Sequence, residues 1–190
     1  MQHTPSLSPH ATGADLRALR KARGLTLTDL AIRLGRSVGW LSQVERDKSA
    51  ATLPDLRDLA QALDVPMAML LRKVNVPDHE ARHIVRRGNR RSVGSHLPGL
   101  VEELLSPDLT DDFEMVHSTF HPGTRVEDTV TRPTKEVAFL LQGRLDLEIA
   151  GVMHVINPGD SFRIRGEPFR WANPYPEAAV AIWVIAPPVY

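Results

Sequence analysis

The sequence predicts an α + β protein of two domains, a bundle of five short helices followed by an antiparallel β-sandwich or barrel. Between Asp15 and Leu71, apolar residues recur at helical spacing. From about Val93 onward they alternate with polar residues at period 2, and short turn signals separate the alternating stretches. A chain of 190 residues is long enough to bury a core in each domain.

The first segment, residues 1–12, is polar and rich in proline and serine, which predicts a disordered arm. A helix is expected over Asp15–Ala22, with Leu16 and Leu19 facing inward. Arg20 is one of four basic residues near the end of this helix. These basic side chains either reach backbone phosphate or favour the helix C-terminus.

The next stretch, Leu25–Arg46, divides into helix, tight turn and helix. Thr26 is a suitable N-cap for the first of these helices, and Gly35 supplies a left-handed stop. Ser37 caps a second helix only two residues later. A connection this short does not suit antiparallel packing and favours two helices that cross steeply.

The second of these helices directs Leu41 and Val44 inward and leaves small polar side chains on its other face. That face lacks acidic residues and is flanked by basic ones. This pattern favours a helix that lies in the major groove of DNA over the alternative, an ordinary helical hairpin with a solvent-exposed face. We expect Ser37, Val38, Gly39, Ser42 and Gln43 to face base edges, with Gln43 reading adenine, and Arg36, Trp40, Arg46 and Lys48 to brace the phosphate backbone.

Two more helices complete the predicted bundle. Thr52 caps a helix whose apolar stripe is core, and Pro66 opens a short helix over Met67–Leu71. The stripe consists of Leu53, Leu56, Leu59, Ala60 and Leu63.

The span Leu16–Leu71 resembles the lambda-repressor-like, XRE-type helix-turn-helix domain. The matching residues are LRALRKARGLTLTDLAIRLGRSVGWLSQVER and TLPDLRDLAQALDVPMAMLL. Asp47 stands where this family usually has glycine, and Ala51 where proline is common. The resemblance implies a DNA-binding domain over residues 13–72, two copies of which dock in successive major grooves of a pseudo-palindromic operator.

The composition limits where this protein acts. The formal net charge is zero, but residues 1–78 hold 11 basic and 8 acidic side chains, against 12 and 15 in residues 79–190. Such modest basicity suits a dimer on a short operator better than a nonspecific DNA binder. Cysteine is absent, and no apolar run reaches membrane length. We therefore expect a cytoplasmic protein without a membrane partner.

After a linker over residues 73–82, the alternating stretches predict strands. They are FEMVHSTF (113–120), EVAFLLQG (136–143), RLDLEIAG (144–151), SFRIR (161–165) and AAVAIWVIA (178–186). Gln142-Gly143 turns between the second and third of these stretches, and Asn157–Asp160 forms a turn before the fourth.

Residues 83–190 resemble a cupin. The stretch Glu136–Gly143 with Gly151 resembles the first half of the cupin signature, and Pro158-Gly159-Asp160 through Pro168, Trp171 and Asn173 resembles the second half. The resemblance implies an antiparallel jelly roll that senses a small molecule and mediates dimerisation. With the first domain, it implies a bacterial transcription regulator.

The cupin resemblance also implies a divalent metal bound by histidines and a glutamate. Here the histidine positions fall on Val130, Arg132 and Phe169, and only Glu136 remains. A single carboxylate does not form a tight metal site. We therefore expect no metal, cofactor or catalytic residue. The alternative is a metal-dependent cupin enzyme that takes its ligands from elsewhere in the chain.

In place of a metal, we expect a small pocket for an anionic or zwitterionic effector. The expected lining is Met115, His117, Arg132, Glu136, Phe169, Trp171 and Trp183. An Arg132–Glu136 pair that simply fills the space is an equal alternative, and the cupin would then be a ligand-free dimerisation module.

Overall fold

The chain divides into two compact units. The computed structural model describes residues 13–71, 77, 79–80, 83–94, 97–107 and 109–189. The predicted arm over residues 1–12 lies outside the described residues, as does most of the predicted linker over residues 73–82. The first unit runs to Arg91 and includes Pro107–Thr110, and the second comprises Ser92–Ser106 and Asp111–Val189.

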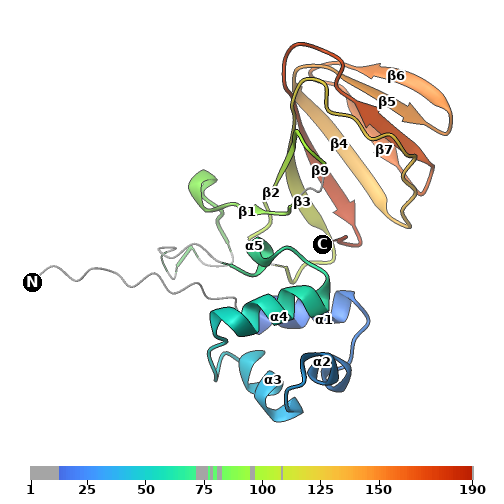
Figure 1. Ribbon diagram of the computed structural model, residues 1–190. Helices are drawn as coiled ribbons and strands as arrows, with labels where there is room; N and C mark the ends of the chain where they lie inside the picture. Colours follow the sequence, from blue (N-terminus) through green and yellow to red (C-terminus); the bar gives the residue numbers. More distant parts are fainter. Residues whose placement is uncertain are drawn as a thin grey trace, which may run out of the picture. The chain divides into compact units, whose positions relative to one another are not determined.

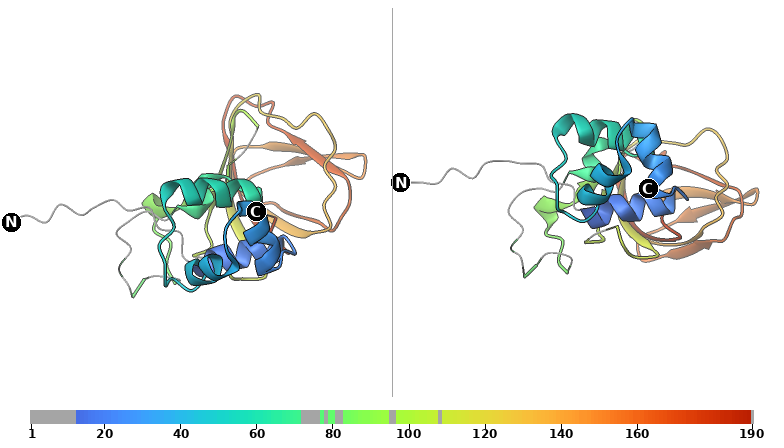
Figure 2. Two further views of the ribbon diagram at one scale, coloured as in Figure 1. Left: turned by 60° about the horizontal axis from the view of Figure 1, so that its bottom comes forward. Right: turned by 90° about the horizontal axis from the view of Figure 1, so that it is seen from below.

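The described part of the first unit contains five α-helices, which confirms the predicted bundle (Figure 1). They are α1 (Gly13–Ala22), α2 (Leu27–Leu34), α3 (Val38–Val44), α4 (Leu53–Leu63) and α5 (Met67–Leu70). A 3-10 helix, η1 (Arg87–Asn89), follows later in the chain. Figure 2 shows from two further sides how closely α3 follows α2 across the turn.

The helix boundaries come from local capping chemistry, as the sequence predicts. Thr26 accepts a hydrogen bond from the backbone N–H of Asp29, whose carboxylate accepts one from the backbone of Thr26 in return. Thr52 begins α4 with the same reciprocal arrangement. Ser37 Oγ accepts the backbone N–H of Trp40 at 3.1 Å, and Gly35 ends α2 in the left-handed region, with φ 61°.

The core of the first unit is aliphatic. Its fully buried side chains include Leu16, Leu19, Leu30, Leu41, Leu56, Leu59, Leu63, Met69 and Leu70. The prediction was wrong for Leu53, which is 49% exposed. Leu53 occupies the first position of α4, and helical spacing alone does not show where along a helix its packing against the bundle begins.

Two buried ion pairs tie distant parts of the first unit together. Arg20 donates to both carboxylate oxygens of Glu45, at 2.6 and 2.9 Å, and to the carbonyl of Leu25 at 2.8 Å. Arg91 donates to Asp15 at 2.6 Å. Each pair is satisfied by close hydrogen bonds, which a buried charge requires.

The second unit is an antiparallel jelly roll. Its strands are β1 (Arg91–Ser92), β2 (Leu100–Leu104), β3 (Glu114–Phe120), β4 (Lys135–Gln142), β5 (Leu145–Ile149), β6 (Val152–Ile156), β7 (Ser161–Ile164), β8 (Phe169–Ala172) and β9 (Ala179–Ala186). One sheet has the order β1-β2-β3-β9-β4-β7 and the other the order β6-β5-β8. The predicted strands correspond to β3, β4, β5, β7 and β9, whereas the sequence analysis did not identify β1, β2, β6 and β8.

The core of this unit lies between the two sheets. Phe120 on β3 and Trp171 on β8 meet edge to face with ring centroids 4.6 Å apart, which joins the larger sheet to the smaller one. Leu145 and Leu147 are buried as expected from their alternation on β5. Among the described residues, no helix of the chain is long and apolar enough to cross a membrane.

Candidate nucleic-acid interface and ligand pocket

Helix α3 presents one face to the core of the first unit and the other to solvent. Leu41 and Val44 are buried, as predicted, whereas Val38, Gly39 and Gln43 are exposed. Ser42 is half-buried and Ser37 is exposed, although the Ser37 hydroxyl is engaged as the helix cap. Four of the five residues that the sequence assigns to base edges therefore lie on the side of α3 away from the core, and Ser37 directly precedes the helix.

Gly39 leaves part of this surface without a side chain. A Cβ atom at this position would meet nothing closer than Ser37 Oγ, at 3.9 Å, so the fold does not require glycine here. Glycine inside a helix costs roughly 0.5–1 kcal/mol relative to alanine. An unneeded glycine on an exposed helix surface fits the close approach of another molecule to the backbone of α3.

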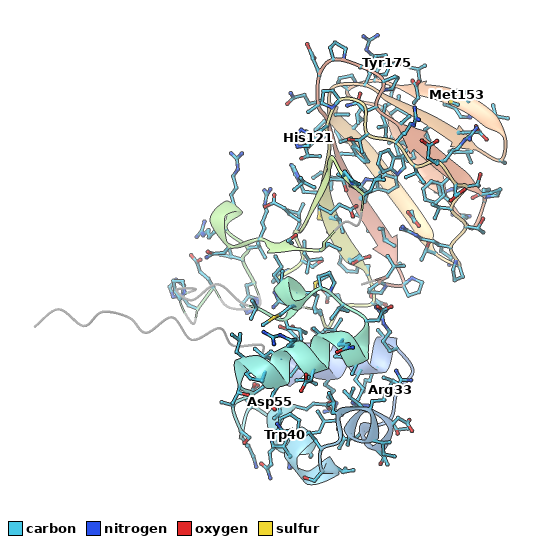
Figure 3. All side chains as sticks on the ribbon, viewed as in Figure 1. Arg33, Trp40, Asp55, His121, Met153 and Tyr175 are labelled. Atoms are coloured by element: carbon cyan, nitrogen blue, oxygen red, sulfur yellow. The ribbon has the colours of Figure 1, made fainter. Side chains whose placement is uncertain are left out.

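Arg36, expected at the phosphate backbone, has partners within the first unit. Its guanidinium forms an ion pair with Asp55 and lies 5.1 Å from the centre of the Trp40 ring. Trp40 and Asp55, both labelled in Figure 3, thus contact the same arginine. Because the side chain of Arg36 is still half exposed and that of Trp40 only half-buried, these contacts orient both groups at the surface.

The end of α3 is fixed by two acidic residues. Glu45 is buried against Arg20, and Asp47 accepts the backbone N–H of Gly13 at 2.6 Å. Asp47 has φ 54°, a left-handed conformation that aspartate tolerates better than most residues. Arg46 and Lys48 remain exposed beside them. The basic side chains thus face solvent while both neighbouring carboxylates are engaged.

Sequence reasoning missed the role of Arg20 and Glu45. From the sequence, Arg20 could contact phosphate or stabilise a helix terminus, whereas the structure buries its side chain against Glu45. Its buried pair with Glu45 connects α1 to the residue that ends α3. The pair therefore positions the exposed face of α3, and the separation of its partners by 25 residues left no local signal.

A cavity of about 300 Å³ lies inside the second unit. It brings together five of the seven residues expected at the effector site: Arg132, Glu136, Phe169, Trp171 and Trp183. The other lining residues are Gly94, Leu97, Leu100, Glu102, Phe120, Val126, Val130 and Ile185.

The predicted positions of Met115 and His117 need correction, because neither side chain lines this cavity. On β3, the side chains of Glu114, Val116 and Ser118 are buried, so the alternate positions point to the opposite face of the sheet. Met115 lies on that outer face and is exposed, beside Val184 of β9.

Arg132 and Glu136 do not fill the cavity by pairing tightly. Arg132 Nη1 lies 4.0 Å from Glu136 Oε1, beyond hydrogen-bonding distance, and the arginine side chain is 42% exposed. Glu136 is only 1% exposed, and its Oε1 accepts the hydroxyl of Thr134 at 2.6 Å. The structure therefore favours an open cavity with Arg132 near its mouth.

Two further glutamates of this unit interact with Arg132 and Glu136, and one of them lines the cavity. Glu102 of β2 lines it and accepts a hydrogen bond from Ser118 at 3.1 Å, and burial raises the pKa of Glu102 above its usual value. Glu114 of β3 is buried, and burial raises its pKa to about 7, against a hydrogen bond from the backbone of Val189 that lowers it. Neither residue is among those that the sequence predicts for the effector site.

The residues of the second unit do not fit the metal that a cupin implies. Val130, Arg132 and Phe169, at the positions of the family's histidines, all line the cavity and supply no imidazole. Within the described part of the chain, no group of three or more histidine, cysteine, aspartate or glutamate residues has an arrangement that could hold a metal ion.

Comparison with known proteins matches each unit to a family. The family described as "Helix-turn-helix domain" matches residues 11–72, and the family described as "Cupin domain" matches residues 116–185. The HTH-type transcriptional repressor RghR of Bacillus subtilis (strain 168) is 38% identical over 73 residues, 37% of this chain. The match spans about half of that relative, 54% of its length.

A second relative matches most of the chain. The HTH-type transcriptional regulator SutR of Escherichia coli (strain K12) is 26% identical over 153 residues, which cover 80% of each protein. Among solved structures, an HTH_3 family transcriptional regulator from Vibrio cholerae covers 94% of this chain and 96% of its own, with 21% identity and a TM-score of 0.43.

Proposed function

Since the chain belongs to the helix-turn-helix transcriptional regulators that carry a cupin domain, we propose that two copies of it bind one operator and that a small effector controls this binding. The outer surface of α3 carries the proposal. Its exposed side is free of acidic side chains, contains a glycine that the fold does not require, and is flanked by Arg46 and Lys48. These features suit a helix that lies in the major groove.

Gln43 is the residue best placed for reading a base. It is exposed on α3, one position before the buried Val44. A glutamine amide can form a bidentate pair with adenine, in which its N–H donates to N7 and its oxygen accepts from the N6 amino group; such a pair is worth about 1–3 kcal/mol of discrimination. Arg36, Arg46 and Lys48 would contact phosphates on either side and set the register of the helix.

Replacing Gln43 by alanine is expected to weaken operator binding about tenfold to a hundredfold and to relax specificity at one base pair of each half-site. The operator is first obtained by selecting bound sequences from a random DNA pool, and affinity is then measured by fluorescence anisotropy. The matched control is Gln61→Ala, because Gln61 is an exposed glutamine on α4. Equal losses of operator affinity in both variants would contradict the assignment of Gln43 to a base contact.

Dimerisation is supported by an apolar surface on the outer face of the larger sheet. Met115, Val137, Phe139, Leu141 and Val184 are between 36% and 50% exposed. They lie on β3, β4 and β9, which are adjacent in the sheet, and Val184 is the direct neighbour of both Met115 and Val137. A contiguous patch of this kind marks an interaction site. A second copy is the partner that two-fold operator recognition requires.

Replacing Phe139 by glutamate is expected to convert the dimer to a monomer, because the variant would bury a charge in an apolar interface. Operator affinity should fall at least about tenfold, since the two half-sites are then no longer bound together. Sedimentation analysis gives the mass of both proteins. Val155→Glu, at an exposed position of β6 in the smaller sheet, serves as the control. A Phe139→Glu protein that keeps the mass of the dimer would exclude this face as the interface.

The cavity around Arg132 and Glu136 supports the effector part of the proposal. Its lining draws on strands of both sheets and combines aromatic side chains with a few charged ones, as small-molecule sites do. An effector bound there would alter operator affinity through a coupling free energy, typically 1–3 kcal/mol. We place this regulation in the cytoplasm, where the operator is.

A further inference from the structure

We propose that the cavity of the second unit binds a small metabolite through a primary ammonium group, held by Glu136 and Glu102 against aromatic walls. This inference rests on the proposed sensor role and narrows the chemistry of the effector. The sequence alone predicts an anionic or zwitterionic ligand.

The charges around the cavity favour a cation. Of the described residues that line it, Glu102 and Glu136 are acidic and Arg132 is basic. Glu114 is buried close enough to interact electrostatically with all three. Buried carboxylates without matching cations cost free energy, which a ligand that brings positive charge would recover. An anionic ligand would add to the excess of negative charge.

The unused hydrogen-bond acceptors of Glu136 and Glu102 also favour an ammonium group. Glu136 lines the cavity with 1% exposure, and the described residues donate only to its Oε1. Glu102 accepts the Ser118 hydroxyl, again through Oε1 alone. A carboxylate accepts about four hydrogen bonds in total. Both side chains can therefore accept more hydrogen bonds, and an ammonium group supplies three N–H donors.

The walls of the cavity add a second attraction for a cation. Phe120, Phe169, Trp171 and Trp183 all line it. Aromatic faces attract ammonium groups, by about 0.5–2 kcal/mol for each well-placed ring, and more strongly where water is excluded. The volume of about 300 Å³ is at the lower limit for ligand pockets, so the ligand is a small metabolite.

Arg132 decides whether the ligand also carries an acid group. Its side chain is 42% exposed and makes no tight pair with Glu136. A guanidinium at the mouth of the cavity can bind a ligand carboxylate in a bidentate manner while the ammonium group occupies the interior. Two classes of ligand carry the ammonium group and fit the cavity: simple amines and amino acids.

The test uses the full-length protein and three matched sets of compounds: L-amino acids, the amines formed by their decarboxylation, and the carboxylic acids formed by their deamination. Thermal shift identifies binders, and calorimetry gives their dissociation constants. We expect binders only among compounds with an ammonium group. Glu136→Gln, which keeps the acceptor for Thr134, should weaken the best binder at least tenfold, whereas the exposed Glu127→Gln should not change it.

Arg132→Gln separates the two sources. If the ligand is an amino acid, this variant weakens its binding at least tenfold and leaves the matching amine unaffected; if the ligand is an amine, neither affinity changes. Binding of the deaminated acids alone, equal binding by Glu136→Gln and the parent protein, or no binder in any set would each overturn the inference. Operator affinity is measured separately, so a protein that binds its operator but no ammonium compound refutes only the ligand class.

Discussion

Replacing Glu45 by glutamine is expected to lower the free energy of unfolding of the first unit by about 3 kcal/mol or more. The change removes the negative charge from a pair that Arg20 reaches with two hydrogen bonds, 2.6 and 2.9 Å long, in a buried position. The arginine stays charged and buried without its partner, and breaking a buried pair in this way typically costs about 3–5 kcal/mol.

The measurement is urea unfolding followed by circular dichroism at 222 nm, which reports the helices. Asp58→Asn, at an exposed position of α4, is the control and should change stability by less than about 0.5 kcal/mol. A double variant, Arg20→Met with Glu45→Leu, removes both charges and should recover much of the loss. A Glu45→Gln protein as stable as the parent would show that the pair does not hold α1 to the end of α3.

Replacing Glu114 by glutamine is expected to stabilise the second unit by about 3 kcal/mol at pH 8 and to have little effect at pH 4. Burial raises the pKa of this carboxyl from 4.5 to about 7, and each unit of such a shift corresponds to about 1.4 kcal/mol. Its other charged neighbours are Glu102 and Glu136, which also raise the pKa, and Arg132, which lowers it. Glutamine keeps an acceptor for the backbone N–H of Val189.

The direction of this pH dependence follows from the folded state, which binds the proton of Glu114 more tightly than the unfolded state. Below pH 4.5 the carboxyl is protonated in both folded and unfolded protein, so Glu114 does not reduce the free energy of unfolding of the parent protein there. Between pH 4.5 and 7 the unfolded chain loses its proton first, and the stability of the parent protein falls as the pH rises. Thermal unfolding at several pH values measures the difference in stability between the parent protein and Glu114→Gln, with Glu127→Gln as the control. A constant difference between parent and Glu114→Gln across this range would contradict the buried carboxyl.

The sequence predicted the features that depend on near neighbours. The caps at Thr26, Ser37 and Thr52 and the stop at Gly35 each require only residues within one turn, so their chemistry can be read directly. Glu136 was also placed at the cavity correctly, because the cupin signature fixes its position within one strand.

The features that were missed depend on which strands and helices become neighbours. On β4, Val137, Phe139 and Leu141 alternate with the buried Ala138 and Leu140, so both faces are apolar and the period of 2 cannot assign the core face. On β3, both faces mix polar and apolar residues, so alternation did not show that Met115 and His117 point away from the core. The half-buried Glu102 of β2 and the buried Glu114 of β3 gave no signal, since acidic residues are usually exposed.

The shortness of α3 limits how much information the protein can read from DNA. A helix of seven residues is about 10 Å long, the length of about three base pairs. A dimer would therefore read about six base pairs directly, a combination that recurs about once in 4,000 positions. Among about a million competing sites this leaves hundreds of chance matches. That count already assumes one fixed spacing between the two half-sites, and each further spacing that the dimer accepted would add as many chance matches again. In the proposed dimer, holding the two copies of α3 at one spacing therefore limits the number of bound sites, and an effector that changed this spacing would change which sites are bound.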